Sequence, residues 1–246
     1  MVAQERAKGD SLLLLDGGDS LMSEPVQPLS LESQGRLVIE AMNLLGYDAI
    51  ALGERDLLLG PDALRQRIDE ADFPVLSANV RLAETGELLA SPYTILNVGG
   101  LSIGIIGLTG TSPDSPPAFT ISDPIAAAED ILKEVEPQAD LIVVLSHLGW
   151  DRNKELADQV SAIDVVISGG MQKLDDQPYH SPTTGARLSQ AELPTAGHAG
   201  RFVGLWKLTI DRDGQIKDSD WRAVFLDSQF VDDPAMVALL AGYRGR

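Results

Sequence analysis

The chain has 246 residues and a formal net charge of -18, with 44% hydrophobic and 23% charged residues, a composition typical of a soluble globular protein. This acidity argues against nucleic acid and anionic membranes as partners, because both repel a negative surface. The chain has no cysteine, which excludes disulfides, thiolate metal ligands and a cysteine nucleophile. No apolar segment approaches the roughly 20 residues of a membrane-spanning helix, so we predict no membrane span.

The N-terminal part of the chain predicts the end of a helix and then a strand. Residues 1–10 are mostly polar and lack the apolar segment of a signal peptide. Arg6 and Lys8 before Gly9 are typical of a last helical turn, so we expect a processed or trimmed N-terminus. The apolar residues Leu12–Leu15 predict a strand buried on both faces.

This first strand ends in Asp16-Gly17-Gly18-Asp19. The two glycines allow a sharp turn and the close approach of a ligand. Carboxylates at the end of a strand either serve a binding site or form an exposed acidic turn. Taken alone, the segment favours the exposed turn.

The rest of the chain alternates between strands and helices before it changes to a strand meander. Apolar residues at helical spacing predict a helix over 31–45, and further helices over 61–71, 125–135, 151–160 and 234–243. Strands are predicted over 47–52, 73–80, 101–108, 141–145, 163–167, 202–210 and 215–225, with a hairpin over 81–98 around Thr85-Gly86. Asp123-Pro124 predicts a capped helix start. This order indicates a single α/β domain, 1–246, with two sheets and helices outside them.

Four of the predicted strands end in polar or glycine-rich loops. These loops contain Asp19, Glu54–Asp56, His147 and Gly169–Gln172. The carboxyl ends of parallel strands meet at one edge of a sheet, so we expect the four loops to form one site.

The same loops, in this order, resemble the metallophosphatase domain of the bacterial 5'-nucleotidase family, a group of calcineurin-like phosphoesterases. The matching segments are Leu-Leu-Leu-Asp-Gly-Gly-Asp at 13–19, Asn-Leu-Leu-Gly-Tyr-Asp-Ala-Ile at 43–50, Phe-Pro-Val-Leu-Ser-Ala-Asn-Val at 73–80 and Val-Leu-Ser-His-Leu-Gly at 144–149. The resemblance covers nearly the whole chain and implies a four-layer α-β-β-α sandwich of the metallophosphatase type. We expect this sandwich to lack the family's first strand, and the chain to lack the family's nucleobase-binding C-terminal domain.

The resemblance also implies a set of metal ligands. In this family an aspartate at the position of Asp19 bridges two divalent ions, and a later histidine and a Gly-His-x-Gln loop supply further ligands. These positions correspond to His147 and Gln172, and Glu54 stands where the family has a ligand asparagine. The structural alternatives are a turn residue for Asp19, a hydrogen-bonded histidine at a strand end for His147 and a loop amide for Gln172.

Other positions depart from the family pattern. Arg55 replaces the catalytic histidine, Leu58 replaces the aspartate that orients it, and Gly170 replaces a ligand histidine. No Asp-x-His precedes Asp19, although the family has one there. An arginine is permanently charged and cannot transfer protons near neutral pH. Its guanidinium can instead pair with Asp19 and take the charge role of a metal.

We therefore predict a 5'-nucleotidase-like domain that has lost two-metal phosphoester hydrolysis and serves a binding or structural role, with no assigned catalytic residue and no cofactor. The alternative is an active phosphoesterase with a metal site rebuilt around Asp19, Glu54, His147 and Gln172. This site would hold Mn, Zn or Mg weakly, and Arg55 would bind the substrate phosphate.

The missing first strand would leave a sheet edge open beside Leu12–Leu15. An open edge predicts pairing with a protein partner or with a second copy of the chain. The resemblance alone implies a periplasmic or cell-surface location, and the residues themselves leave the compartment undecided.

Overall fold

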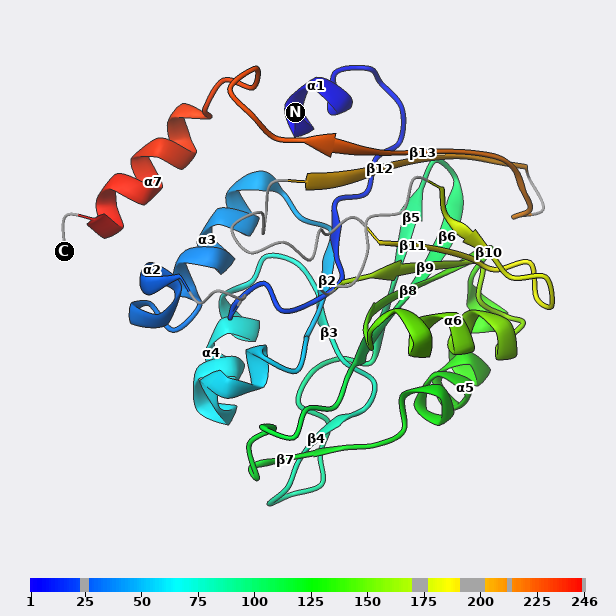
Figure 1. The fold of residues 1–246 in the computed structure, drawn as a ribbon, viewed down its shortest axis with the longest axis horizontal. Coiled ribbons are helices and arrows are strands. Elements are labelled where there is room, and N and C mark those ends of the chain that lie inside the picture. Colours follow the sequence, from blue (N-terminus) through cyan, green and yellow to red (C-terminus); the bar gives the residue numbers. More distant parts are fainter. Residues whose placement is uncertain (23–26, 170–176, 191–201, 212–213, 245–246) are drawn as a thin grey trace.

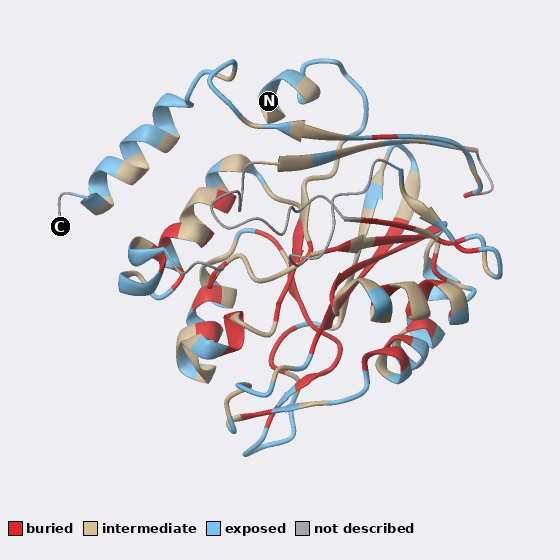
Figure 2. Cartoon of the chain, viewed as in Figure 1, coloured by how far each residue is buried: buried red, intermediate tan, exposed pale blue. Residues whose placement is uncertain are grey.

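The computed structural model describes residues 1–22, 27–169, 177–190, 202–211 and 214–244 (Figure 1). Two sheets pack against each other, and helices cover their outer faces. This is the predicted α-β-β-α sandwich. Figure 2 shows that the buried residues follow the strands and the helix faces turned towards them.

The smaller sheet is parallel and has the order β1-β2-β3. Its strands are β1 (Leu15–Asp16), β2 (Ala49–Ala51) and β3 (Val75–Leu76). Its outer face is covered by α3 (Arg36–Leu45), the 3-10 turn η1 (Asp56–Leu59) and α4 (Pro61–Glu70), and α2 (Pro28–Glu32) lies against α3. Side chains alternate along β2, so Ile50 packs with these helices while Ala49 and Ala51 face the other sheet.

The larger sheet has the order β10-β11-β9-β8-β6-β5. Its strands are β5 (Tyr93–Val98), β6 (Leu101–Thr109), β8 (Leu141–His147), β9 (Val165–Ser168), β10 (Tyr179–His180) and β11 (Arg187–Gln190). The outer strands β5 and β10 are antiparallel to their neighbours, and the other four strands run parallel. Its outer face is covered by α5 (Pro124–Val135), followed by the 3-10 turn η2 (Glu136–Gln138), and by α6 (Trp150–Gln159).

Two strand pairs and two terminal helices complete the described chain. The strands β4 (Val80–Leu82) and β7 (Phe119–Ile121) pair antiparallel, as do β12 (Phe202–Ile210) and β13 (Ile216–Phe225). Short α1 (Val2–Arg6) begins the chain, and α7 (Pro234–Arg244) has no buried residue and lies beside α3 (Figure 1). No helix in the described ranges is long and apolar enough to cross a membrane.

Two predictions for the N-terminal half are wrong in detail. Leu12–Leu15 are half-buried rather than buried on both faces, because β1 begins only at Leu15 and pairs on one side, with β2. The helix predicted over 31–45 is divided into α2 and α3. Gln34 and Gly35 lie between them with φ values of 50° and 78°, which a continuous right-handed helix does not contain.

Two predicted strand arrangements are also wrong. The segment 73–80 contributes to two sheets, because β3 joins the smaller sheet and Val80 begins β4. A turn does form near Thr85-Gly86, with a bridge between Arg81 and Leu88. The strand over 93–98, however, turns at Gly99-Gly100 and pairs with β6, because both glycines adopt positive φ values, 61° and 86°.

Candidate metal centre

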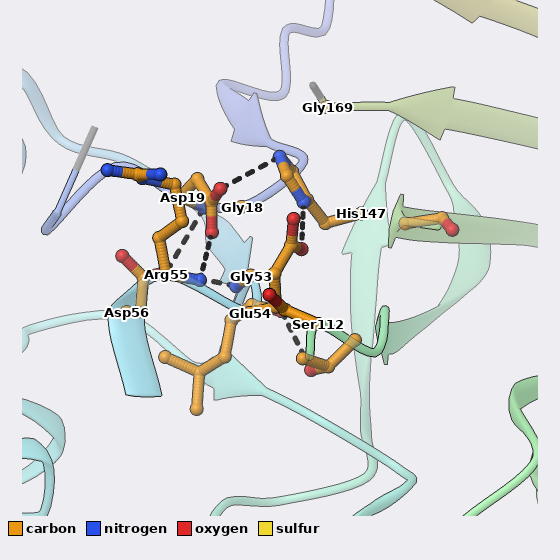
Figure 3. A network of polar contacts seen from close by, with 12 residues as sticks. Gly18, Asp19, Gly53, Glu54, Arg55, Asp56, Ser112, His147 and Gly169 are labelled. Carbon is orange, nitrogen blue, oxygen red and sulfur yellow. Dashed lines mark hydrogen bonds and ion pairs between the residues drawn. The ribbon is translucent and has the colours of Figure 1, made fainter. Parts of the chain in front are cut away.

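Three of the four predicted metal ligands meet where the carboxyl ends of the two sheets lie together (Figure 3). Asp19 follows β1 and Glu54 follows β2, both in the smaller sheet. His147 ends β8 in the larger sheet. The site therefore lies between the sheets, and each sheet supplies part of it.

The ring of His147 lies between two carboxylates. Its Nδ1 is 2.6 Å from Glu54 Oε2, and its Nε2 is 3.4 Å from Asp19 Oδ2. One ligand atom from each of the three residues lies within 4.8 Å of the others. The side chains of His147 and Asp19 are 9% and 11% exposed, so the cluster is largely shielded from water.

Glycines allow the loops to approach this closely. A Cβ on Gly53 would lie 2.0 Å from Asp19 Oδ1, and a Cβ on Gly169 would lie 2.8 Å from His147 Cδ2. Asp19 itself has a φ of 60°, and its Oδ1 accepts a hydrogen bond of 2.8 Å from the backbone N–H of Arg55. Side chains at the glycine positions would displace the ligand atoms.

Asp56, which is 1% exposed, holds the first two loops together. Its Oδ1 accepts hydrogen bonds from the N–H groups of Leu21 and Met22, and its Oδ2 accepts from those of Asp19 and Gly53. The sequence placed Asp56 in a charged loop but gave no signal for this structural role, because burial of an acidic residue depends on distant segments.

The three ionisable groups shift one another's pKa values. Burial raises the pKa of Asp19 to about 7, against the opposing charge of His147. Burial by itself would lower the pKa of His147, but the hydrogen bond to Glu54 and the nearby carboxylates raise it to about 9. Burial would raise the pKa of Glu54, yet the hydrogen bond and charge of His147 lower it. Near neutral pH the cluster therefore contains an imidazolium–glutamate ion pair.

This donor set fits one divalent cation. Carboxylate oxygens are ligands of Zn²⁺, Mn²⁺ and Mg²⁺, and among these ions an imidazole nitrogen suits Zn²⁺ best. Three protein ligands leave coordination positions open to other ligands. Binding would require His147 to lose a proton, so the cation would take over the positive charge that now lies between the carboxylates.

Among the other predicted positions, the side chains of Arg55 and Leu58 lie outside this cluster. The guanidinium of Arg55 lies on the far side of Asp19 from His147 (Figure 3), and its Nε donates to the backbone carbonyl of Met22 at 3.3 Å. Arg55 thus contacts Asp19 through its backbone rather than through its charge. Leu58 is 45% exposed. The predicted ligand Gln172 and the neighbouring Gly170 lie outside the described residues.

A cleft of about 590 Å³ opens beside Glu54 and His147. The loops 110–111, 121–124 and 148–152 line the rest of it. At its rim Arg152 bonds to Asp123 and, at 2.5 Å, to Glu155 Oε2. The cleft is within the size range of small-molecule sites, roughly 300–1,000 Å³. Its lining was not predicted, because the sequence pattern does not show which loops border the cluster in space.

No family model matches the chain. The chain is 30% identical over 269 residues to 5'-nucleotidase from Bos taurus, an alignment that covers 99% of this chain and 46% of the relative. The fold matches the crystal structure of the 5'-nucleotidase precursor from Thermus thermophilus with a TM-score of 0.86 and 25% identity, over 99% of this chain and 51% of that one. It also matches calcineurin-like phosphoesterase YfkN from Bacillus subtilis with a TM-score of 0.80 and 22% identity, over 99% and 86% of the two chains.

The chain thus spans about half the length of the first two of these proteins. The alignments nevertheless include both sheets, their covering helices and the loops of the site. The bovine relative and the Thermus thermophilus neighbour are both named 5'-nucleotidase, and the Bacillus subtilis neighbour is named a calcineurin-like phosphoesterase. The chain belongs to the 5'-nucleotidase family of calcineurin-like metallophosphatase domains.

Proposed function

We propose that this domain has lost two-metal phosphoester hydrolysis and serves a binding role, with one divalent cation held by Asp19, Glu54 and His147. The observation that carries the proposal is the position of the Arg55 side chain. This residue stands in place of the family's catalytic histidine, and its guanidinium is directed to the carbonyl of Met22, away from the cluster.

The chemistry of hydrolysis explains why this replacement supports the proposal. Two-metal hydrolysis needs ligands for both ions and a group that steadies or protonates the leaving oxygen. A guanidinium stays protonated and cannot exchange a proton with the leaving group near neutral pH. The bound cation would act as a Lewis acid, polarising an oxygen of whatever ligand it contacts. The protein's own contribution is to orient three donors at the edge of the cleft.

Calorimetric titration of chelator-treated protein with Mn²⁺ or Zn²⁺ tests the cation site. We expect about one ion per chain, with binding lost in Asp19→Asn because a ligand carboxylate becomes an amide. Asp220→Asn is the matched control, because Asp220 is exposed on β13, outside the cluster. Absence of binding in the wild type, or full binding in the Asp19 variant, would refute the assignment.

A phosphatase assay of the same samples tests the loss of hydrolysis. With p-nitrophenyl phosphate and AMP as substrates, we expect no metal-dependent turnover in any variant. Metal-dependent turnover that disappears in Asp19→Asn would overturn the proposal.

The cleft beside the cluster favours a second candidate, an active phosphoesterase with a rebuilt one-ion site. Its volume of about 590 Å³ admits a small phosphate ester next to Glu54 and His147. In this candidate Arg55 would bind the substrate phosphate, which requires its guanidinium to leave the Met22 carbonyl. The phosphatase assay separates the two candidates.

We also propose that the domain binds a protein partner, or a second copy, through β1. Among the described strands, β1 pairs only with β2 and forms one edge of the smaller sheet. Edge strands with free backbone groups readily accept another strand. Light scattering should show an assembly whose dissociation constant rises in Leu15→Pro, because proline removes a backbone donor of β1. A strict monomer at high concentration would contradict this interface.

A further inference from the structure

The candidate metal centre is divided between two sheets that no ladder of the described strands joins, although an isolated bridge pairs Leu76 with Ser91 and the N–H of Ala78 donates to the carbonyl of Gly107. Asp19 and Glu54 come from the smaller sheet, and His147 comes from the larger one. Between the sheets lie mainly apolar side chains, such as Ala51, Leu76 and Leu145. Apolar packing is non-directional, so it does not by itself determine how far Glu54 lies from His147.

Thr109 supplies a directional contact at this point. It is the last residue of β6, is fully buried, and is paired in register with His147 on β8. Its hydroxyl donates to the carbonyl of Leu52 at 2.7 Å, two residues before Glu54. The hydroxyl oxygen of Ser77, a residue that follows β3, lies 2.8 Å from the hydroxyl oxygen of Thr109. Because the Thr109 hydroxyl has one hydrogen, which Leu52 accepts, Ser77 is the donor in this second bond.

Thr109 therefore belongs to the larger sheet by its backbone and bonds to the smaller sheet by its side chain. Asn79 fixes that backbone from both directions, because its Nδ2 donates to the Thr109 carbonyl at 2.7 Å and its Oδ1 accepts the Thr109 N–H at 2.9 Å. The next residue, Gly110, lies against the cluster. A Cβ there would be 2.4 Å from the His147 carbonyl and 3.4 Å from Glu54 Oε2.

We propose that Thr109 is a positioning residue whose hydroxyl sets the place of Glu54 relative to His147, and thereby the cation affinity of the site. The effect on affinity rests on the proposed cation site, whereas the effect on the Glu54–His147 contact does not. Thr109→Val has the same shape and removes only the hydroxyl, which leaves the Leu52 carbonyl and the Ser77 hydroxyl without this partner. Thr109→Ser restores the hydroxyl.

The contact itself is tested by imidazole ¹⁵N–¹H spectra of the metal-free protein at one fixed pH. The chain has only three histidines, so the signals of His147 can be assigned by substitution. We expect Thr109→Val to shift the His147 ring signals and Thr109→Ser to leave them close to wild type. Ser77→Ala removes one of the two hydroxyl bonds and should produce a smaller shift in the same direction, which keeps the test available if Thr109→Val does not fold.

Thr184→Val is the matched control. The Thr184 hydroxyl donates to the carbonyl of Ala157 at 2.5 Å, so the substitution removes the same kind of bond. Thr184 lies in the turn before β11, whose first residue, Arg187, pairs with Val165 at the start of β9. The metal site lies at the opposite, carboxyl ends of the parallel strands. This variant should leave the His147 signals unchanged.

Calorimetric titration with Mn²⁺ or Zn²⁺ tests the consequence for affinity. We expect binding to weaken by about tenfold in Thr109→Val, and to remain near wild type in Thr109→Ser and Thr184→Val. If the wild type binds no cation, the proposed function fails and the spectra alone decide the role of Thr109. Unchanged His147 signals in folded Thr109→Val, or in Ser77→Ala, would overturn the proposal.

Discussion

Removing the carboxylate of Asp56 is expected to destabilise the whole domain, even though Asp56 contributes no ligand atom to the cluster. Its Oδ1 accepts the N–H groups of Leu21 and Met22 at 2.9 and 3.1 Å, and its Oδ2 accepts those of Gly53 and Asp19 at 2.9 and 3.1 Å. These donors belong to the loops after β1 and β2. Asp56 therefore connects the two loops that carry Asp19 and Glu54.

The magnitude follows from the donors that lose their acceptor. In Asp56→Ala the N–H groups of Leu21, Met22 and Gly53 remain buried without a partner. Each such group costs about 1–3 kcal/mol, so even the lower value predicts a loss of about 3 kcal/mol of unfolding free energy. Asp56→Asn keeps one acceptor oxygen and turns an NH₂ group towards two donors, so we expect a loss of about 2 kcal/mol or more. Both losses are large against a typical total of about 5–15 kcal/mol.

Urea unfolding followed by circular dichroism measures these losses. Asp123→Asn is the matched control, because Asp123 accepts the N–H groups of Ile125 and Ala126 at the start of α5 and its side chain is 52% exposed. Asparagine caps helices as well as aspartate does, and the exposed pair with Arg152 contributes little, so the control should lose less than about 1 kcal/mol. Stability of Asp56→Ala within about 1 kcal/mol of wild type would refute the reasoning.

Two further substitutions test the site. Gly53→Ala would place a Cβ 2.0 Å from Asp19 Oδ1 and should abolish cation binding in calorimetry. Gly242→Ala is the control and should preserve binding, because the space around Gly242 is open. Full cation binding by Gly53→Ala would contradict the geometry. The pKa of His147 is about 9 in the fold and 6.5 for a free histidine, so the folded state binds its proton more tightly. The resulting stability is complete below pH 6.5 and is lost as the pH rises through 9. In EDTA, the urea midpoint of the wild-type protein should fall as the pH rises over this range. The fall should be less steep in His147→Gln and as steep as in the wild type in His180→Gln. A wild-type midpoint that does not change with pH would disprove the coupling between His147 protonation and stability.

The local patterns of the chain were sufficient for most helices, several strands and the order of the loops. Asp123-Pro124 predicted a helix start, and the Asp123 carboxylate does cap α5. The strand ends also predicted that Asp19, Glu54 and His147 would come together, as they do, although the site lies between two sheets rather than at one edge of a single sheet. The family resemblance implied the sandwich, and the sequence relatives and structural neighbours confirm the family.

Local sequence patterns did not predict the interactions that depend on a residue's neighbours in space. The pairing of the Arg55 charge with Asp19 does not form, because the side chain bonds to Met22 and the contact with Asp19 is made by the backbone. Burial of Asp56 and its four N–H donors likewise could not be read from a charged loop.

The sequence by itself determined which segments become helices and which strand ends carry polar residues, because periodicity and turn residues act over a few positions. Only the tertiary structure decided how the two sheets meet. The bond from Thr109 to Leu52 joins residues 57 positions apart, and the contact of His147 with Glu54 joins residues 93 apart. Such distances are determined by the packing of whole layers, which no local pattern contains.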